Sequence, residues 1–187
     1  KNNDISVKGL MRYLKGPDFP TGGLVVNKDD LLKIYETGTG KLRVRGKVET
    51  VKLKGGRQQL VITEIPYTMI GANIGKFLND IASLVENKKT TDIVDISNQS
   101  SKEGIRIVLD LKRDADVENL TNMLYKKTKL EDTFGVNMLA VADGRPETLS
   151  LKQVIEHHVD FVFDITTRKY TTLLNKEQEK KEIQEGL

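Results

Sequence analysis

The stretch that most constrains this 187-residue chain begins at Ser150 and contains no glycine or proline before Gly186. Ser150 followed by Gln153 forms a capping box, which predicts that a helix starts at Leu151. About 36 helical residues at ~1.5 Å each reach ~54 Å. A helix this long with a narrow apolar stripe needs an antiparallel partner, as in a coiled coil, and we expect that partner beyond Leu187 or in another subunit. The stripe consists of Leu151, Ile155, Val159, Val162, Ile165 and Leu173.

The chain before this helix predicts a mixed α+β fold. Residues 58–142 read strand, helix, strand, strand, helix, strand, the split βαβ or ferredoxin-like order. This order predicts an antiparallel sheet with two helices on one face. Residues 41–53 form a further basic strand, and a turn at 54–57 joins it to 58–65 as an added β-hairpin. We therefore expect two domains, residues 1–148 with this α+β fold and residues 149–187 with the start of the long C-terminal helix.

The alternation in Gly40–Val48 gives the basic strand two chemically different faces. Its apolar face predicts a buried core contact through Leu42, Val44 and Val48. Its opposite face carries four cations, Lys41, Arg43, Arg45 and Lys47. Such a row fits the phosphates of DNA or RNA, but it also fits an ordinary exposed strand, because edge strands often carry Lys and Arg. The pattern alone leaves both interpretations open.

Positive charge is concentrated around this strand. The whole chain has a net charge of only +3 and a pI of about 8.9, unlike histone-like proteins. Residues 41–57 hold seven Lys and Arg against one acid, Glu49, which gives +6 and leaves −3 for the rest. Any nucleic-acid binding must therefore come from this cluster. The candidate DNA-binding residues are Lys41, Arg43, Arg45, Lys47, Lys52, Lys54 and Arg57.

The sequence contains no pattern typical of a catalytic or metal site. It has no Cys, which excludes disulfides, thiol catalysis and Cys-ligated zinc and fits a cytosolic protein. His157 and His158 are adjacent, so on a helix they point about 100° apart and cannot form the i,i+4 pair of a helical metal site. No apolar run approaches the ~20 residues of a membrane span. We expect no catalytic residue, no metal ligand and no membrane partner.

Eight segments carry recognisable motifs in order along the chain. They are Lys15–Gly23, Tyr35–Lys41, Arg43–Val48, Thr63–Tyr67, Gly104–Val108, Leu111–Asp114, Thr133–Ala140 and Asp143–Pro146. They resemble the A subunits of bacterial type IIA DNA topoisomerases, that is, the A subunit of DNA gyrase or that of the closely related topoisomerase IV. Gly-Pro-Asp-Phe-Pro-Thr at 16–21 and Phe-Gly-Val-Asn-Met at 134–138 are the most specific segments.

The resemblance implies that residues 1–148 are the tower domain of the breakage–reunion core and that 149–187 begin its coiled-coil arm. In this family the DNA-cleaving tyrosine lies in a preceding winged-helix domain. Its motif is not reproduced at Arg12-Tyr13, so no catalytic residue is assigned and the chain alone is expected to be inactive. The chain starts at Lys1 and ends in a charged helical pattern, so we expect a fragment of a longer protein.

The resemblance also implies partners for the parent protein. These are double-stranded DNA, the topoisomerase B subunit, which provides the Mg²⁺ and ATP sites, and a second A subunit in an A2B2 complex in the bacterial cytoplasm at the nucleoid. No cofactor is expected in this fragment.

Two hypotheses for the role of this fragment stay open. It supports the bent, cut DNA through backbone contacts, or it is a structural module that links the DNA gate and the C-terminal gate, with its cations paired to acids such as Glu49.

Overall fold

The computed structural model describes residues 4–71 and 73–186. Its contacts group the chain into two compact units. We call residues 14–31 and 40–136 the sheet unit and residues 1–13, 32–39 and 137–187 the helix unit. The predicted domains, 1–148 and 149–187, stay a prediction, and residues 1–3, 72 and 187 within them lie outside the described part of the chain.

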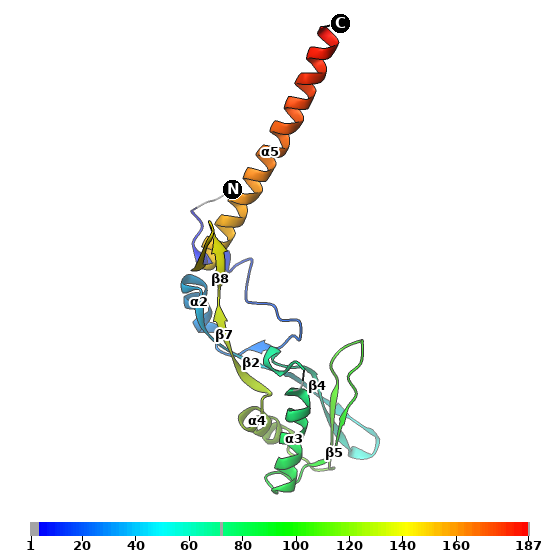
Figure 1. The fold of residues 1–187 in the computed structure, drawn as a ribbon. Coiled ribbons are helices and arrows are strands. Elements are labelled where there is room, and N and C mark those ends of the chain that lie inside the picture. The colour runs from blue at the N-terminus through cyan, green and yellow to red at the C-terminus, as the bar shows by residue number, and fades with distance from the viewer. Residues whose placement is uncertain (1–3, 72, 187) are drawn as a thin grey trace. The chain divides into compact units, whose positions relative to one another are not determined.

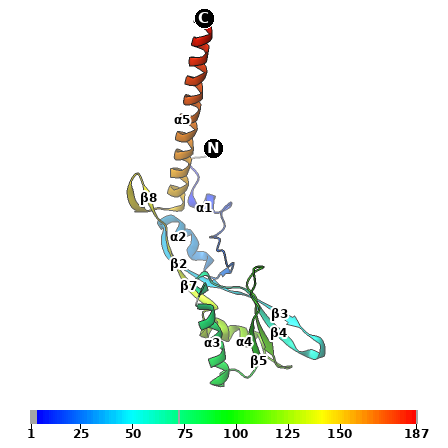
Figure 2. The same ribbon diagram turned by 45° about the vertical axis from the view of Figure 1, so that its right-hand side comes forward.

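The sheet unit is built on an antiparallel sheet with the strand order β3-β4-β6-β5. Its strands are β3 (Lys47–Lys52), β4 (Gln58–Glu64), β6 (Ile107–Leu111) and β5 (Ile93–Asn98), and its helices are α3 (Asn73–Glu86) and α4 (Val117–Lys127). Both helices lie on the same side of the sheet (Figures 1 and 2). Leu60 and Leu109 alternate onto this face and are buried with Phe77 of α3 and Leu120 of α4. The core of the unit therefore lies between the sheet and the two helices.

A second sheet in this unit joins β1 (Leu24–Val25), β2 (Thr39–Arg45) and β7 (Glu131–Asn137). It differs from the sequence expectation in two ways. The basic stretch 41–53 is divided at Gly46 into β2 and β3, which belong to different sheets. The last strand of the expected ferredoxin-like order, β7, pairs in the second sheet, because β3 already occupies the edge of β4 where that strand would lie.

Gly46 explains why the basic stretch is divided there. Its N–H donates a hydrogen bond to the carbonyl of Leu130 at 2.8 Å, and its carbonyl accepts one from the Tyr125 hydroxyl at 3.1 Å. A Cβ at this position would lie 2.6 Å from the Glu64 carbonyl oxygen and from the Leu130 side chain. Only glycine therefore lets the segment that follows α4 cross here, and β7 begins beside β2 as a result.

The helix unit contains α1 (Val7–Leu10), most of α2 (Leu31–Thr37), the hairpin β8 (Leu139–Ala142) with β9 (Arg145–Thr148), and α5 (Leu151–Glu185). The predicted capping box is confirmed, because the Ser150 and Gln153 backbone N–H groups donate to each other's side chains at 2.8 and 3.2 Å. Leu151 is the one buried residue of α5, so the rest of its apolar stripe is at least partly exposed. None of the described helices is both long and apolar enough to cross a membrane.

Candidate nucleic-acid interface

Strand β2 shows the alternation that the sequence predicted. Leu42 and Val44 are fully buried, while Lys41 and Arg43 are exposed on the opposite face. Because β2 is the middle strand of its sheet, its backbone is fixed from both sides. The basic side chains of β2 therefore project from a rigid support.

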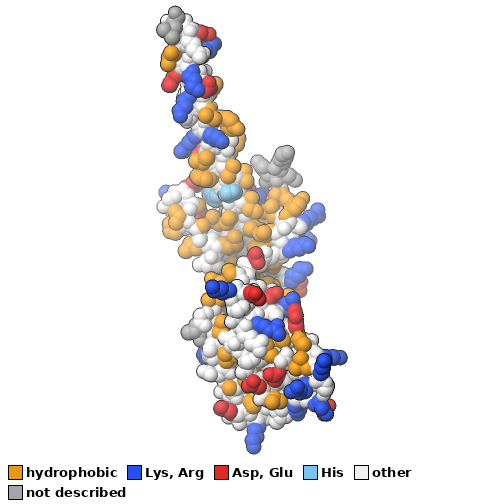
Figure 3. Space-filling model, turned by 90° about the vertical axis from the view of Figure 1, so that its right-hand side faces the viewer, with side chains coloured by type: hydrophobic (Ala, Val, Ile, Leu, Met, Phe, Trp, Pro, Cys, Tyr) orange, Lys and Arg blue, Asp and Glu red, His pale blue; other side chains and the backbone are white. Residues whose placement is uncertain are grey.

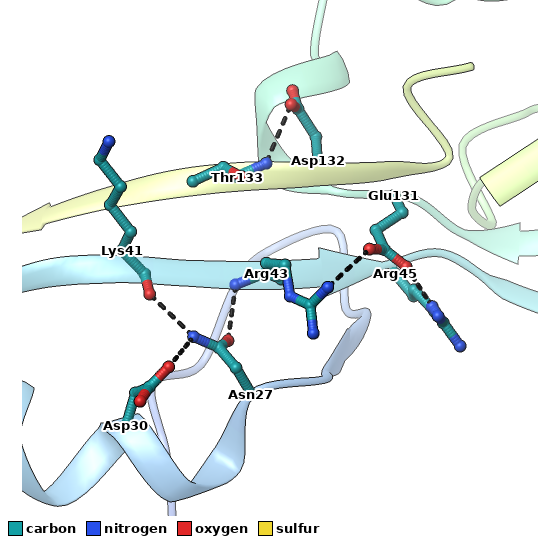
Figure 4. A network of polar contacts seen from close by, with 8 residues as sticks. All are labelled: Asn27, Asp30, Lys41, Arg43, Arg45, Glu131, Asp132 and Thr133. Carbon is teal, nitrogen blue, oxygen red and sulfur yellow. Dashed lines mark hydrogen bonds and ion pairs between the residues drawn. The ribbon is translucent and has the colours of Figure 1, made fainter. Parts of the chain in front are cut away.

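Asn27 fixes the position of β2 further (Figure 4). Its side-chain amide donates to the Lys41 carbonyl at 2.9 Å, and its amide oxygen accepts from the Arg43 N–H at 2.7 Å. The same amide donates to Asp30 at 2.8 Å, which fixes the orientation of the Asn27 side chain. These bonds involve only the backbone of Lys41, whose ammonium group points away from Asn27 in Figure 4.

Glu131 on β7 holds the two arginines of β2. Its carboxylate accepts a hydrogen bond from the Nε of Arg45 and lies 3.6 Å from a terminal nitrogen of Arg43 (Figure 4). The Glu131 side chain is only 17% exposed, whereas that of Arg43 is 53% exposed. The Arg43 contact is the longer of the two and its side chain is the more exposed, at 53% against 38% for Arg45, so it is the weaker contact in water.

Arg45 is also stacked on an aromatic ring. Its guanidinium carbon lies 4.6 Å from the centre of the Tyr125 ring, a cation–π distance. The Tyr125 hydroxyl in turn donates to the Gly46 carbonyl at 3.1 Å. Burial raises the pKa of Tyr125, the Arg45 charge lowers it and the Glu131 charge raises it, with a net increase. Arg45 is therefore part of the packing between β2, α4 and β7.

Lys47 opens β3 and is paired as well. Its ammonium nitrogen lies 3.3 Å from the Glu49 carboxylate, two residues along the same strand face. Both side chains are about half exposed, so this pair contributes little to stability. Three of the four cations predicted as one row, Arg43, Arg45 and Lys47, are thus paired with acids, and Gly46 divides the row between two sheets.

The remaining candidates lie at the tip of the β3–β4 hairpin. Lys52, Lys54 and Arg57 are exposed around the turn η2 (Lys54–Gly56), which the Leu53 N–H closes by donating to the Arg57 carbonyl at 2.8 Å. Within residues 4–71 and 73–186, neither these three side chains nor Lys41 forms an ion pair. Figure 3 shows Lys and Arg side chains gathered along one edge of the sheet unit. Among the seven candidate residues, the unpaired charges are therefore Lys41 and the three at the hairpin tip.

A polar cluster surrounds Asp132, the residue after Glu131 on β7. Asp132 accepts hydrogen bonds from the Thr68 hydroxyl at 2.7 Å and from the Thr133 N–H at 2.9 Å, and it pairs with Lys129 at 3.1 Å. Burial raises the pKa of Asp132, but these three donors together outweigh it and lower the pKa. Asp132 therefore stays ionised and serves a structural role. Among the described residues, no group of three or more His, Cys, Asp or Glu side chains is arranged to hold a metal ion.

Comparison of the sequence with known proteins identifies the family of this chain. The family model for the A subunit of DNA gyrase/topoisomerase IV matches residues 1–187. The chain therefore belongs to the family of DNA gyrase and topoisomerase IV A subunits, as the sequence motifs predicted.

Individual relatives include both branches of this family. The A subunit of DNA gyrase from Clostridium acetobutylicum is 41% identical over the whole chain, which covers 22% of that relative. The gyrase A subunit of Staphylococcus epidermidis is 39% identical over the whole chain, which covers 21% of it. The A subunit of DNA topoisomerase 4 from the same organism is 36% identical over 98% of the chain, which covers 23% of it. The chain thus spans about a fifth of the length of these relatives.

Proposed function

We propose that this chain supports and positions the bent DNA segment that a bacterial type II topoisomerase cuts and reseals. Family membership supports a role in such an A subunit. The observation that carries the DNA contact is a set of exposed cations without an ion-pair partner in the described part of the chain, namely Lys41, Lys52, Lys54 and Arg57. In this proposal they bind phosphates of the DNA backbone and read no base sequence.

Backbone contacts suit such a support because they fix the position of a duplex regardless of its sequence. Smooth bending of a 20–30 bp site costs on the order of 1–6 kcal/mol, which additional contacts must offset. The hairpin fixes the backbone that carries these cations, so the entropy lost when they meet phosphates is mainly that of their side chains. Arg43 and Lys47 add to this surface when a phosphate replaces their weakly held acids, whereas Arg45 stays in its packing role.

A second candidate function is that of a structural module that links the DNA gate and the C-terminal gate. The pairing of Arg43 and Arg45 with Glu131, and of Lys47 with Glu49, favours this alternative. In that case the basic residues stabilise the chain and contribute nothing to DNA affinity. The two candidates differ in whether removal of the free cations changes DNA bending.

For the whole protein we propose the partners of such an A subunit. These are duplex DNA, a B subunit that provides the Mg²⁺ and ATP sites, and a second A subunit in an A2B2 complex in the bacterial cytoplasm. The chain itself is proposed to bind no cofactor and to perform no DNA cleavage.

Gyrase and topoisomerase IV are both compatible with the identities of 41% and 36% to the two kinds of relative. We favour gyrase, and a supercoiling assay of the whole enzyme distinguishes the two.

The proposal is tested in an A2B2 enzyme that contains this chain. Lys41, Lys52, Lys54 and Arg57 are replaced by Gln together, and DNA bending is measured by fluorescence energy transfer alongside cleavage. We expect the fraction of bent DNA and the fraction of cleaved DNA each to fall by about tenfold or more. A matched variant replaces four other exposed lysines of the sheet unit, Lys76, Lys88, Lys89 and Lys102, and should stay within about twofold of wild type. Unchanged bending in the first variant favours the structural module.

A further inference from the structure

Arg113, just beyond the end of β6, lies at the same end of the sheet as the hairpin tip. The antiparallel register pairs Gln58 at the start of β4 with Leu111 at the end of β6. The residue before Gln58 is Arg57, and Arg113 follows Leu111 by two positions. The register thus brings cations from two segments far apart in the sequence to one end of the sheet.

The side chain of Arg113 lies against the hairpin turn. A Cβ built on Gly56 would be 3.7 Å from the Cγ of Arg113, the ordinary distance of van der Waals contact. Its neighbour Lys112 is directed to another partner, because its ammonium nitrogen lies 2.9 Å from Asp92 and 3.2 Å from the Thr91 hydroxyl. Lys112 is therefore neutralised within the chain, whereas Arg113 adds its charge to the turn.

The acids around this end of the sheet leave Arg113 free. Asp110 accepts a hydrogen bond from the Gln59 amide at 2.7 Å, and Asp92 is paired with Lys112. Asp114 is the next residue, but the described residues include no ion pair between it and Arg113. Lys52, Lys54, Arg57 and Arg113 are all exposed and together carry four positive charges.

The turn itself is open to a ligand of high negative charge. Gly55 and Gly56 have φ values of +79° and +76°, and nothing lies within 4 Å of a Cβ built on Gly55. The backbone of the turn therefore has no side chain that would keep a phosphate away. The planar guanidinium of an arginine can bind a phosphate through two parallel hydrogen bonds, which a lysine cannot do.

We propose that Arg113 joins Lys54 and Arg57 in one phosphate-binding site, at which the β3–β4 turn and the end of β6 bind the backbone of duplex DNA together. This inference rests on the proposed function and adds to it a residue from a separate strand. The site is defined by the end of the sheet and not by the basic strand alone. Its ligand is the sugar–phosphate backbone of DNA, since one surface brings several cations within reach of a chain of closely spaced negative charges.

The test measures binding of the 187-residue chain to a fluorescein-labelled 30-bp duplex by anisotropy at several salt concentrations. We expect Arg113→Gln to weaken binding by about three- to tenfold and to reduce the slope of log K against log salt by about 0.9. The matched control is Arg106→Gln, because Arg106 is an exposed arginine just outside the opposite end of β6. It should stay within about twofold of wild type.

Arg113→Lys keeps the charge but loses the two parallel hydrogen bonds, so it should keep the wild-type salt slope and lose less affinity than Arg113→Gln. Equal losses in the Gln and Lys variants, or an Arg113→Gln variant that behaves like Arg106→Gln while wild type binds, would overturn the site. These outcomes leave the proposed function intact. A wild-type chain that binds no duplex at any salt concentration would overturn both.

Discussion

Arg45 on β2 donates a hydrogen bond from its Nε to the carboxylate of Glu131 on β7, 86 residues later in the sequence. The same carboxylate lies 3.6 Å from Arg43, so one acid holds two cations of the basic strand. Glu131 thus holds Arg43 and Arg45, whereas Lys41 and the cations of the hairpin tip form no ion pair in the described part of the chain. Several expectations about binding and stability depend on this difference.

Neutralising Glu131 should raise DNA affinity. Glu131→Gln removes a negative charge that repels phosphates and releases Arg43, the more exposed of its two partners. We expect binding of duplex DNA to become about two- to fivefold tighter at low salt, with the gain lost at high salt because screening shortens the range of the charge. Anisotropy titrations at several salt concentrations measure this. Glu86→Gln, at the exposed end of α3, is the charge-matched control. Equal affinities of the two variants would show that Glu131 does not compete with DNA.

Arg45 should matter more for stability than Arg43. Arg45→Ala loses both the bond to Glu131 and the contact with the Tyr125 ring, and it leaves a mostly buried carboxylate with a weaker partner. We expect a loss of about 1–2 kcal/mol in the free energy of unfolding. Arg43→Ala should cost only about 0–1 kcal/mol, as exposed ion pairs do. Urea denaturation of both variants measures the difference, and a reversed order would refute the packing role of Arg45.

The sequence predicted the parts of this surface that depend on neighbouring residues. The alternation of Lys41, Leu42 and Arg43 across the two faces of β2 is confirmed, and so is the cap at Ser150, because each follows from spacing within a few residues. The pair of Arg45 with Glu131 has no local signal, since it requires that β7 lie beside β2. The pairing of a strand cation with Glu49, weighed as an alternative, is present at Lys47.

The division of the basic stretch at Gly46 also has no signal in the neighbouring residues. A glycine between Arg45 and Lys47 does not interrupt the alternation of charged and apolar residues, so 41–53 reads as one strand. What ends β2 there is the approach of Leu130, a contact between positions 84 apart in the sequence. The position of Arg113 beside the turn likewise follows only from the register of β4 with β6.

Substitution of Gly46 tests its close approach to Glu64 and Leu130. Gly46→Ala places a methyl group 2.6 Å from the Glu64 carbonyl oxygen, which the backbone can relieve only by moving two strands apart. We expect a loss of about 1–3 kcal/mol in the free energy of unfolding. Gly135→Ala on β7 is the matched control, since no atom lies within 4 Å of its Cβ. The free energy of unfolding of this variant should equal that of wild type or exceed it by up to about 1 kcal/mol. Calorimetry compares the two, and equal stability would contradict the close approach at Gly46.

Asp132 should make the sheet unit sensitive to acid. Its pKa in the folded state is lowered below the usual value of 3.8, so the stability it contributes is fully present above that value. The contribution is lost as the pH falls through the lowered pKa. We therefore expect the Tm difference between wild type and Asp132→Asn to be largest near neutral pH and to shrink below about pH 4. Asp95→Asn, at an exposed position of β5, should follow the wild-type profile. A constant difference down to pH 2 would contradict the role of the three donors to Asp132.

Binding of DNA through its backbone is tested most directly by the salt dependence of duplex binding by the wild-type chain. If Lys41 and the cations of the hairpin tip neutralise about four phosphates, log K should fall with log salt with a slope of roughly −3 to −4, and equally for duplexes of unrelated sequence. A slope near zero, or binding confined to one sequence, would contradict a role in holding DNA by its backbone.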